Sequence, residues 1–125
     1  MSAFDELGSI PPQLLAERYV GRVVHGEQLT LAVVEVAPGA VLPEHEHVHE
    51  QFGIVIVGSV DFRVGAETKT VETESIWRIP SGTSHTVTGG AEGAVVVDIF
   101  SPARDDWAAR ERMELRPAQW PQEAP

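Results

Sequence analysis

Four of the five histidines in this sequence fall into two groups, with His45, His47 and His49 close together and His85 further along the chain. Residues i and i+2 of a strand point to the same face, so His45 and His47 can present their imidazoles side by side. Neutral imidazole is a common protein ligand for Zn, Cu, Fe and Ni. A third imidazole from His85, together with the amide of Gln51, would make a mononuclear site with open positions for a substrate.

The alternative is a polar surface strand whose histidines contact only solvent, which is the usual explanation of an isolated His-x-His. Here His85 ends a second informative segment, Ile-Pro-Ser-Gly-Thr-Ser-His, at residues 79–85. The combination of the two segments favours a metal site. His49 is the alternative to Gln51 as the fourth ligand, and we expect it at the rim.

A carboxyl group interrupts the apolar run Val-Val-Val-Asp-Ile-Phe at residues 95–100. Side chains alternate along a strand, so Val96, Asp98 and Phe100 share one face. If that face lines the interior, burial raises the pKa of the Asp98 carboxyl, and such a group can shuttle protons. The alternative is an Asp98 that faces solvent on an edge strand.

Short apolar runs rich in Val and Ile predict the strands that would carry these side chains. Val60, Phe62 and Val64 alternate with polar residues, which is the pattern of a half-buried strand. Short strands separated by many of the 11 glycines and 9 prolines favour an antiparallel sandwich or barrel over a βαβ fold. The predicted strands cover residues 29–36, 53–57, 60–64, 75–79 and 94–100.

The two ends of the chain carry the only helical signals. Residues 12–20 are expected to form a short helix or a loop leading into a strand, and residues 105–113 a short helix with few apolar anchors. The proline-rich tail, 116–125, is expected to be extended or frayed. We therefore expect a single domain over 1–125, with a barrel at roughly 20–101 and a C-terminal segment at 102–125.

Composition excludes several classes of protein. The 125 residues fit one domain, and the absence of cysteine removes disulfide scaffolds, thiolate metal sites and cysteine nucleophiles. A net charge of −10 makes a nucleic-acid partner improbable, and an anionic substrate would need a local positive site. No apolar run is long enough to span a membrane, and the acidic start of the chain does not resemble a signal peptide. We expect a cytoplasmic location and no membrane partner.

Two motifs resemble those of the cupin superfamily. The first is typically a glycine, five residues, His-x-His, an acidic residue a few positions further on, then six residues and a glycine, and here Gln51 stands where Glu is usual. The second is Pro-x-Gly-x-x-His, with Glu74 and Gly89 departing from its usual flanking residues. The resemblance implies an all-β fold, an antiparallel jelly-roll barrel with a metal inside one mouth. The matching residues are Gly39, His45, His47 and Gly58 in the first motif and Pro80, Gly82 and His85 in the second.

Residues 98–107 also resemble the Asp-x-Phe-Ser-Pro-x-Arg-x-Asp-Trp ending of cupins of the KdgF type, which open the ring of unsaturated uronates. Residues 23–27 and 49–51 are similar to that group too, so the resemblance spans roughly 20–107. It implies that Asp98 is the acid/base residue, that Phe100 is a wall against the sugar ring, and that Arg104 is a clamp for the substrate carboxylate. The implied metal ligands are His45, His47, Gln51 and His85.

The function implied by this resemblance is conversion of 4,5-unsaturated monouronates to linear 4-deoxy-5-keto uronates. The implied cofactor is one divalent ion (Zn, Ni, Mn or Fe), and the implied partners are a small anionic sugar and a second copy of the chain. Neutral Gln51 in place of Glu leaves more positive charge at the metal, which favours isomerisation or cyclisation over oxygenase chemistry. The alternatives are a polyketide cyclase or isomerase cupin, a non-catalytic binding module, and an oxygenase.

The sequence also predicts the location of five further side chains. Trp77 is expected in the core, and Trp107 is expected to anchor the C-terminal segment against the barrel. His25 is expected to be structural or on the surface. Arg78 is expected at the pocket or in solvent. For Arg104 the alternative to a carboxylate clamp is a surface salt bridge with Asp105 or Asp106.

Overall fold

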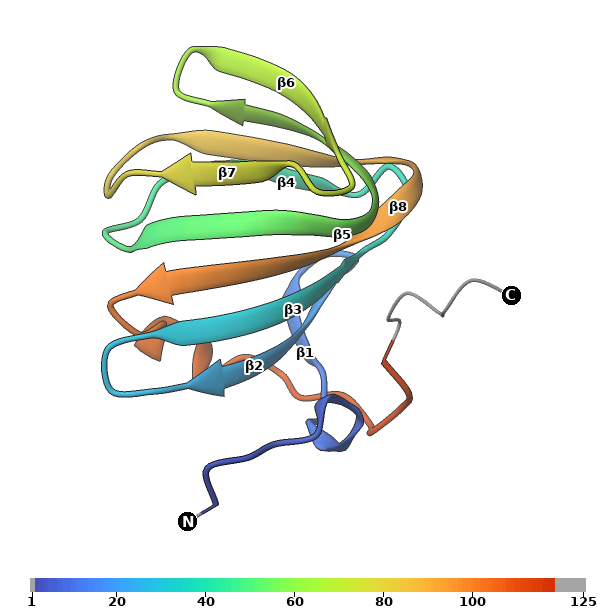
Figure 1. Cartoon of the computed structure of the whole chain (residues 1–125), viewed down its shortest axis with the longest axis vertical. Coiled ribbons are helices and arrows are strands. Elements are labelled where there is room, and N and C mark those ends of the chain that lie inside the picture. The colour runs from blue at the N-terminus through green and yellow to red at the C-terminus, as the bar shows by residue number, and fades with distance from the viewer. Residues whose placement is uncertain (1, 119–125) are drawn as a thin grey trace.

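Antiparallel strands make up most of the structure, a computed structural model that describes residues 2–118. Figure 1 shows β1 to β3 at one end of the molecule and β6 at the other, with β5 and β8 running between them. The elements are η1 (Leu7–Ser9), β1 (Gln13–Ala16), β2 (Tyr19–His25), β3 (Thr30–Val36), β4 (Val41–His45), β5 (Glu50–Val64), β6 (Glu67–Glu72), β7 (Ile76–Ile79), β8 (His85–Ser101) and η2 (Asp105–Trp107), where η marks a 3-10 helix.

Strands β5 and β8 are long enough to belong to two layers. The C-terminal part of β8 pairs with β3, and the N-terminal part of β5 pairs with β7, so that one layer has the order β1-β2-β3-β8-β5-β7. The remaining halves of the same two strands pair with β4 and β6 and form the second layer. The expected all-β jelly roll is confirmed.

Two glycines allow β5 and β8 to bend from one layer into the other. Gly58 and Gly93 both have positive φ, +84° and +73°, which other residues rarely adopt. A Cβ built on Gly58 would overlap the carbonyl oxygen of Gly93, so the two strands approach each other here as only glycine allows. The register of the β5–β8 pair also shifts around Gly58. The bend folds the long strands over a shared interior.

Several predicted boundaries were wrong. The runs at 53–57 and 60–64 are parts of one bent strand, β5. Residues 12–20 contain no helix: β1, a turn and the start of β2 occupy them, so the sheet begins at Gln13 rather than near residue 20.

The helix predicted at 105–113 is reduced to the three residues of η2. Beyond it the backbone bonds to β1, with Leu14 N donating to Glu111 O and Met113 N donating to Pro12 O. With few apolar anchors to hold a helix against the barrel, this segment instead satisfies its hydrogen bonds along the β1 edge. Of the predicted extended tail, residues 119–125 lie outside the described residues.

The outer surface of the first layer is apolar. Leu31, Ile99 and Phe52 are neighbours in register across β3, β8 and β5, and each is more than 40% exposed. Exposed apolar patches often mark interfaces. The homodimer remains a prediction, and this exposed apolar face is a candidate surface for it. Within residues 2–118, no helix is long and apolar enough to cross a membrane.

Trp77 lies in the core, as expected, and its position depends on Gly53 beside it. The two residues are paired across β7 and β5, and a Cβ built on Gly53 would overlap the indole ring. We expect Gly53→Ala to displace the indole and to lower the free energy of unfolding by about 1–3 kcal/mol, as overpacking does. Urea denaturation followed by tryptophan fluorescence measures this change.

Gly8→Ala is the matched control, because a Cβ at this exposed residue meets no atom within 4 Å. Gly8→Ala should change the free energy of unfolding by no more than about 0.5 kcal/mol. Equal stability of the two variants would contradict the close contact between Gly53 and Trp77.

Candidate metal centre

Three imidazoles meet at one mouth of the barrel. His45 ends β4, His85 begins β8, and the two residues are paired in register. His47 follows in the loop between β4 and β5, so the expectation that His45 and His47 share one strand was wrong, although their rings still lie together. One ligand nitrogen from each of the three rings lies within 4.8 Å of the others, an arrangement that could hold a metal ion.

Backbone carbonyls fix which nitrogen of each ring can bind a metal. Nδ1 of His45 contacts Pro43 O at 2.8 Å, Nδ1 of His47 contacts His49 O at 2.9 Å, and Nδ1 of His85 contacts Thr83 O at 2.8 Å. A carbonyl only accepts, so each ring carries a proton on Nδ1 and, when neutral, an unprotonated Nε2. Metal-ligating histidines typically have this outer partner.

The surroundings keep two of these rings neutral. Burial lowers the pKa of His85 to about 4, and repulsion from charge on the neighbouring side chains, Arg104 among them, acts in the same direction. Burial also lowers the pKa of His47, assisted by the Arg104 charge. The side chain of His85 is almost fully buried, at 1% exposed. Neutral imidazole is the form that binds metals.

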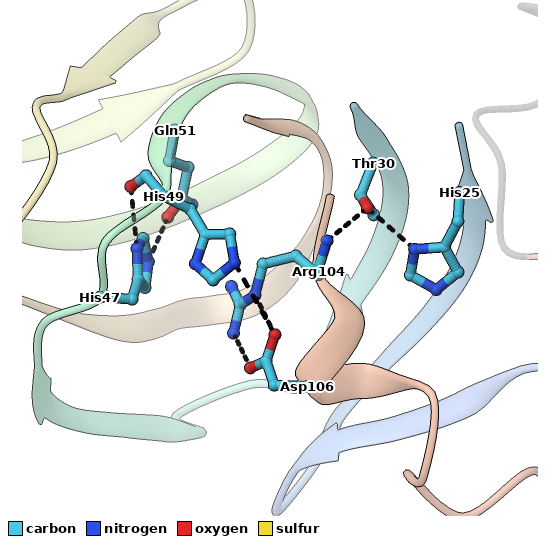
Figure 2. Close-up of polar contacts among 7 residues, drawn as sticks. All are labelled: His25, Thr30, His47, His49, Gln51, Arg104 and Asp106. Carbon is cyan, nitrogen blue, oxygen red and sulfur yellow. Dashed lines mark hydrogen bonds and ion pairs between the residues drawn. The ribbon is translucent and has the colours of Figure 1, made fainter. Parts of the chain in front are cut away.

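Gln51 supplies an oxygen to the same group. Its Nε2 donates to Asp98 Oδ1 at 2.9 Å, which turns its Oε1 toward His47 Nε2 at 3.1 Å (Figure 2). The Gln51 oxygen and the neutral His47 nitrogen both accept hydrogen bonds, so they repel each other unless a cation lies with them. The donor set of three imidazoles and one amide oxygen therefore fits a divalent metal ion.

Asp98 lies inside the barrel, on the face that the strand alternation indicated. It is 7% exposed, and its Oδ1 accepts hydrogen bonds from Gln51 and from Trp77 Nε1, the latter at 3.2 Å. Burial raises the pKa of Asp98 to about 6, against the lowering effect of these hydrogen bonds and of Arg104. A carboxyl with this pKa can both give and take a proton near neutrality.

Arg104 lies at the edge of the cavity and packs against two aromatic rings. Its guanidinium carbon is 4.7 Å from the centre of the Phe100 ring and 4.0 Å from that of Trp107. It also pairs with Asp106, which is one of the two salt-bridge partners considered for it. Arg104 nevertheless lines the cavity and is 8% exposed, so the ion pair belongs to the site rather than to the outer surface.

The cavity itself has a volume of about 380 Å³ and extends from the histidines into the barrel. Its polar lining includes the three histidines, Gln51, Asp98 and Arg104, together with Glu44 and Arg110. The remaining walls are mainly apolar and come from most of the strands and from the C-terminal segment. They include Leu15, Tyr19, Val34, Val36, Leu42, Val60, Phe62, Val87, Val96, Phe100 and Trp107.

The other predicted residues surround this site. Trp107 is buried and packs edge-on against Phe100, as expected of an anchor. His49 lies beside Asp106, with 3.9 Å between its Nε2 and Asp106 Oδ1 (Figure 2). His25 lies away from the three imidazoles and contacts Thr30. Arg78 is exposed on β7 and is absent from the residues that line the cavity.

Sequence reasoning missed two contributions. Thr30, fully buried on β3, accepts a hydrogen bond from the backbone N–H of Arg104 at 2.8 Å. The β1 residues Leu15 and Ala16 also line the cavity. Neither carried a signal, because Thr30 contributes one hydroxyl 74 residues away from its partner and β1 is too short to show a pattern.

Comparisons with known proteins agree with this geometry. The family described as Cupin domain matches residues 32–100 of the chain. The pectin degradation protein KdgF of Dickeya dadantii (strain 3937) is 29% identical over 86 residues, which cover 68% of this chain and 78% of that protein.

Two solved structures have the same overall shape. KdgF from a Halomonas species superimposes with a TM-score of 0.78 at 25% identity, covering 85% of this chain and 98% of that one. An RmlC-like cupin from Shewanella frigidimarina NCIMB 400 superimposes with a TM-score of 0.80 at 20% identity, covering 86% and 97%, and this second likeness shows the fold alone.

Proposed function

Because the chain belongs to the cupin family, we propose that it is a metal-dependent enzyme that opens the ring of 4,5-unsaturated monouronates. The products would be linear 4-deoxy-5-keto uronates. One observation carries this proposal. Three imidazoles that present their Nε2 atoms lie together, and the buried carboxyl of Asp98 is connected to them through Gln51. The similarity to two proteins named KdgF supports the same reaction class.

The reaction is an isomerisation that moves one proton. In the closed substrate the ring oxygen is part of an enol ether, and C1 carries a hydroxyl. Loss of the O1 proton forms the C1 carbonyl and breaks the bond from C1 to the ring oxygen, which leaves as an enolate. Protonation at C4 then gives the 5-keto product. A divalent cation, when bound, supplies a Lewis acid that lowers the cost of the negative charge on oxygen.

Asp98 is the residue that we assign to move that proton. Its Oδ1 is held by two N–H donors, and Oδ2 has no hydrogen bond to residues 2–118 and is not a fully enclosed unpaired atom. Oδ2 is therefore the oxygen that is open to the cavity. We assign it to take the proton from O1 and to return it at C4.

Arg104 is the proposed partner of the uronate carboxylate. A guanidinium offers two parallel N–H donors to a carboxylate, a geometry that Lys cannot match. It also provides local positive charge within a chain of net charge −10. Phe100 lies near both this group and the histidines, with its ring centre 5.9 Å from that of His47 and 4.7 Å from the Arg104 guanidinium carbon, and would form a wall beside the sugar ring.

The test is the ultraviolet absorbance of the double bond conjugated to the substrate carboxylate. Metal-loaded protein mixed with monouronates released by a pectate or alginate lyase should make this absorbance fall faster than it does spontaneously. A chelator should stop the acceleration, and a redox-inert divalent metal should restore it. An unchanged spontaneous rate with fully metal-loaded protein would refute the proposal.

A cyclase or isomerase acting on a larger ligand is the second candidate, and the apolar walls of the cavity favour it. Tyr19, Val34 and Val36 line space that a fully hydroxylated sugar would not use. A bicyclic aromatic carboxylate that binds more tightly than a uronate, in a protein that opens no rings, would support this candidate.

A further inference from the structure

Asp106 holds the Arg104 guanidinium by one particular edge. Arg104 Nε donates to Asp106 Oδ1 at 3.0 Å, and Nη2 donates to Oδ2 at 2.8 Å. This is a bidentate pair along the side of the guanidinium, which is the strong and directional form of such a contact. The Arg104 side chain in the pair is only 10% exposed, whereas Asp106 is half exposed.

Three further contacts reduce the freedom of Arg104. Phe100 and Trp107 both pack against the guanidinium, and the backbone N–H donates to the buried Thr30 hydroxyl. In Figure 2 the guanidinium lies between the Asp106 carboxylate and the loop that carries His47 and His49. The side chain is therefore held in place before any ligand arrives.

One edge of the guanidinium remains available. Nη1 makes no hydrogen bond to the described part of the chain, and it is not among the fully enclosed polar atoms without a partner. Since Arg104 lines the cavity, this nitrogen and the second hydrogen of Nη2 are the donors that a ligand can reach.

From these contacts we propose that Asp106 is a positioning residue, which presents the Nη1–Nη2 edge of Arg104 to the cavity so that the site accepts one carboxylate end-on. The inference rests on the proposed function for the identity of the ligand, a uronate. It assigns the selectivity for an acid over a neutral sugar to a pair of residues, Asp106 and Arg104, rather than to Arg104 alone.

Charge and geometry make opposite predictions for the loss of Asp106. Removing a negative charge beside Arg104 would, by Coulomb attraction alone, strengthen the binding of an anion. If Asp106 acts by orientation, its removal weakens binding instead, because the guanidinium no longer holds a productive direction. In enzymes, a misplacement of about 1 Å can lower the reaction rate by up to about a hundredfold.

The experiment is calorimetric titration of the metal-loaded protein with glucuronate, which lacks the double bond and is not turned over, and with glucose. The parent protein should bind glucuronate in preference to glucose. Asp106→Ala should weaken glucuronate binding by about tenfold or more and leave glucose unchanged. Asp106→Asn, which keeps one acceptor for the guanidinium, should fall between the parent and Asp106→Ala.

Asp105→Ala is the matched control, since Asp105 is exposed and its side chain makes no hydrogen bond or ion pair with Arg104. It should bind glucuronate like the parent. Tighter or unchanged binding in both Asp106 variants, or no preference for glucuronate in the parent, would overturn the inference.

Kinetics separates this inference from the proposed function. With the unsaturated uronate as substrate, Asp106→Asn should raise KM more than it lowers kcat, a split that general loss of structure would not give. A parent that selects glucuronate through Asp106 but opens no rings would refute the proposed reaction and leave the positioning role intact.

Discussion

Replacing His45 with alanine should empty the metal site while leaving the barrel folded. His45 is only partly buried, so its loss should cost less packing than the loss of His85, which is almost fully enclosed. Loss of an outer partner of a ligand already weakens metal binding by about 10–100-fold, and loss of a ligand itself should exceed this range. Elemental analysis of the dialysed protein measures bound metal, and the rate of uronate ring opening should fall with it.

His25→Ala is the control for metal content. His25 lies outside the three-histidine group, and its contact is with Thr30. This variant should therefore keep its metal. Full metal occupancy in His45→Ala would mean that the imidazoles meet without forming the site that binds the ion.

Asp98→Asn should stop proton transfer while preserving the geometry around it. The asparagine oxygen can still accept from Gln51 and Trp77, as Asp98 Oδ1 does, but the group no longer exchanges a proton near neutrality. Removing a general acid or base typically lowers a rate by about 10²–10⁴-fold, and we expect a loss in that range. The decrease in substrate absorbance measures the rate, and metal content should stay at the parent level.

Asp61→Asn makes the same substitution at an exposed carboxylate that contacts Thr70 instead of the site. Its rate should equal that of the parent. If Asp98→Asn also reacted at the parent rate, the proton would have to travel by another group and the proposed role of Asp98 would be wrong.

The fold and most of the residues at the candidate metal centre could be anticipated because their signals are local. His45, His47 and Gln51 lie within seven residues, and strand alternation alone indicated that Asp98 shares a face with Phe100. The weakest predictions concerned β1 and the C-terminal segment. These two elements are held by hydrogen bonds between the chain ends, such as Met113 N to Pro12 O, and no periodicity within either end reports such a contact.

The neighbours of Arg104 were hard to foresee for a related reason. Asp106 was considered only as a surface partner, because a spacing of two residues does not show which way either side chain points. The decisive contacts come from Thr30, 74 residues earlier, and from the packing of Trp107. Only a folded barrel brings these groups to one guanidinium.

The segment after β8 has a consequence for how this scaffold could diversify. The three grouped histidines lie on or next to barrel strands, whereas Arg104, Asp106 and Trp107 lie in a short appendage that follows the last strand. Under the proposed roles, the residues that would hold a metal and those that would select a carboxylate are encoded in separate stretches of the gene. Exchanging roughly residues 102–110 between related barrels would be a modular route to new specificities that leaves the inorganic centre undisturbed.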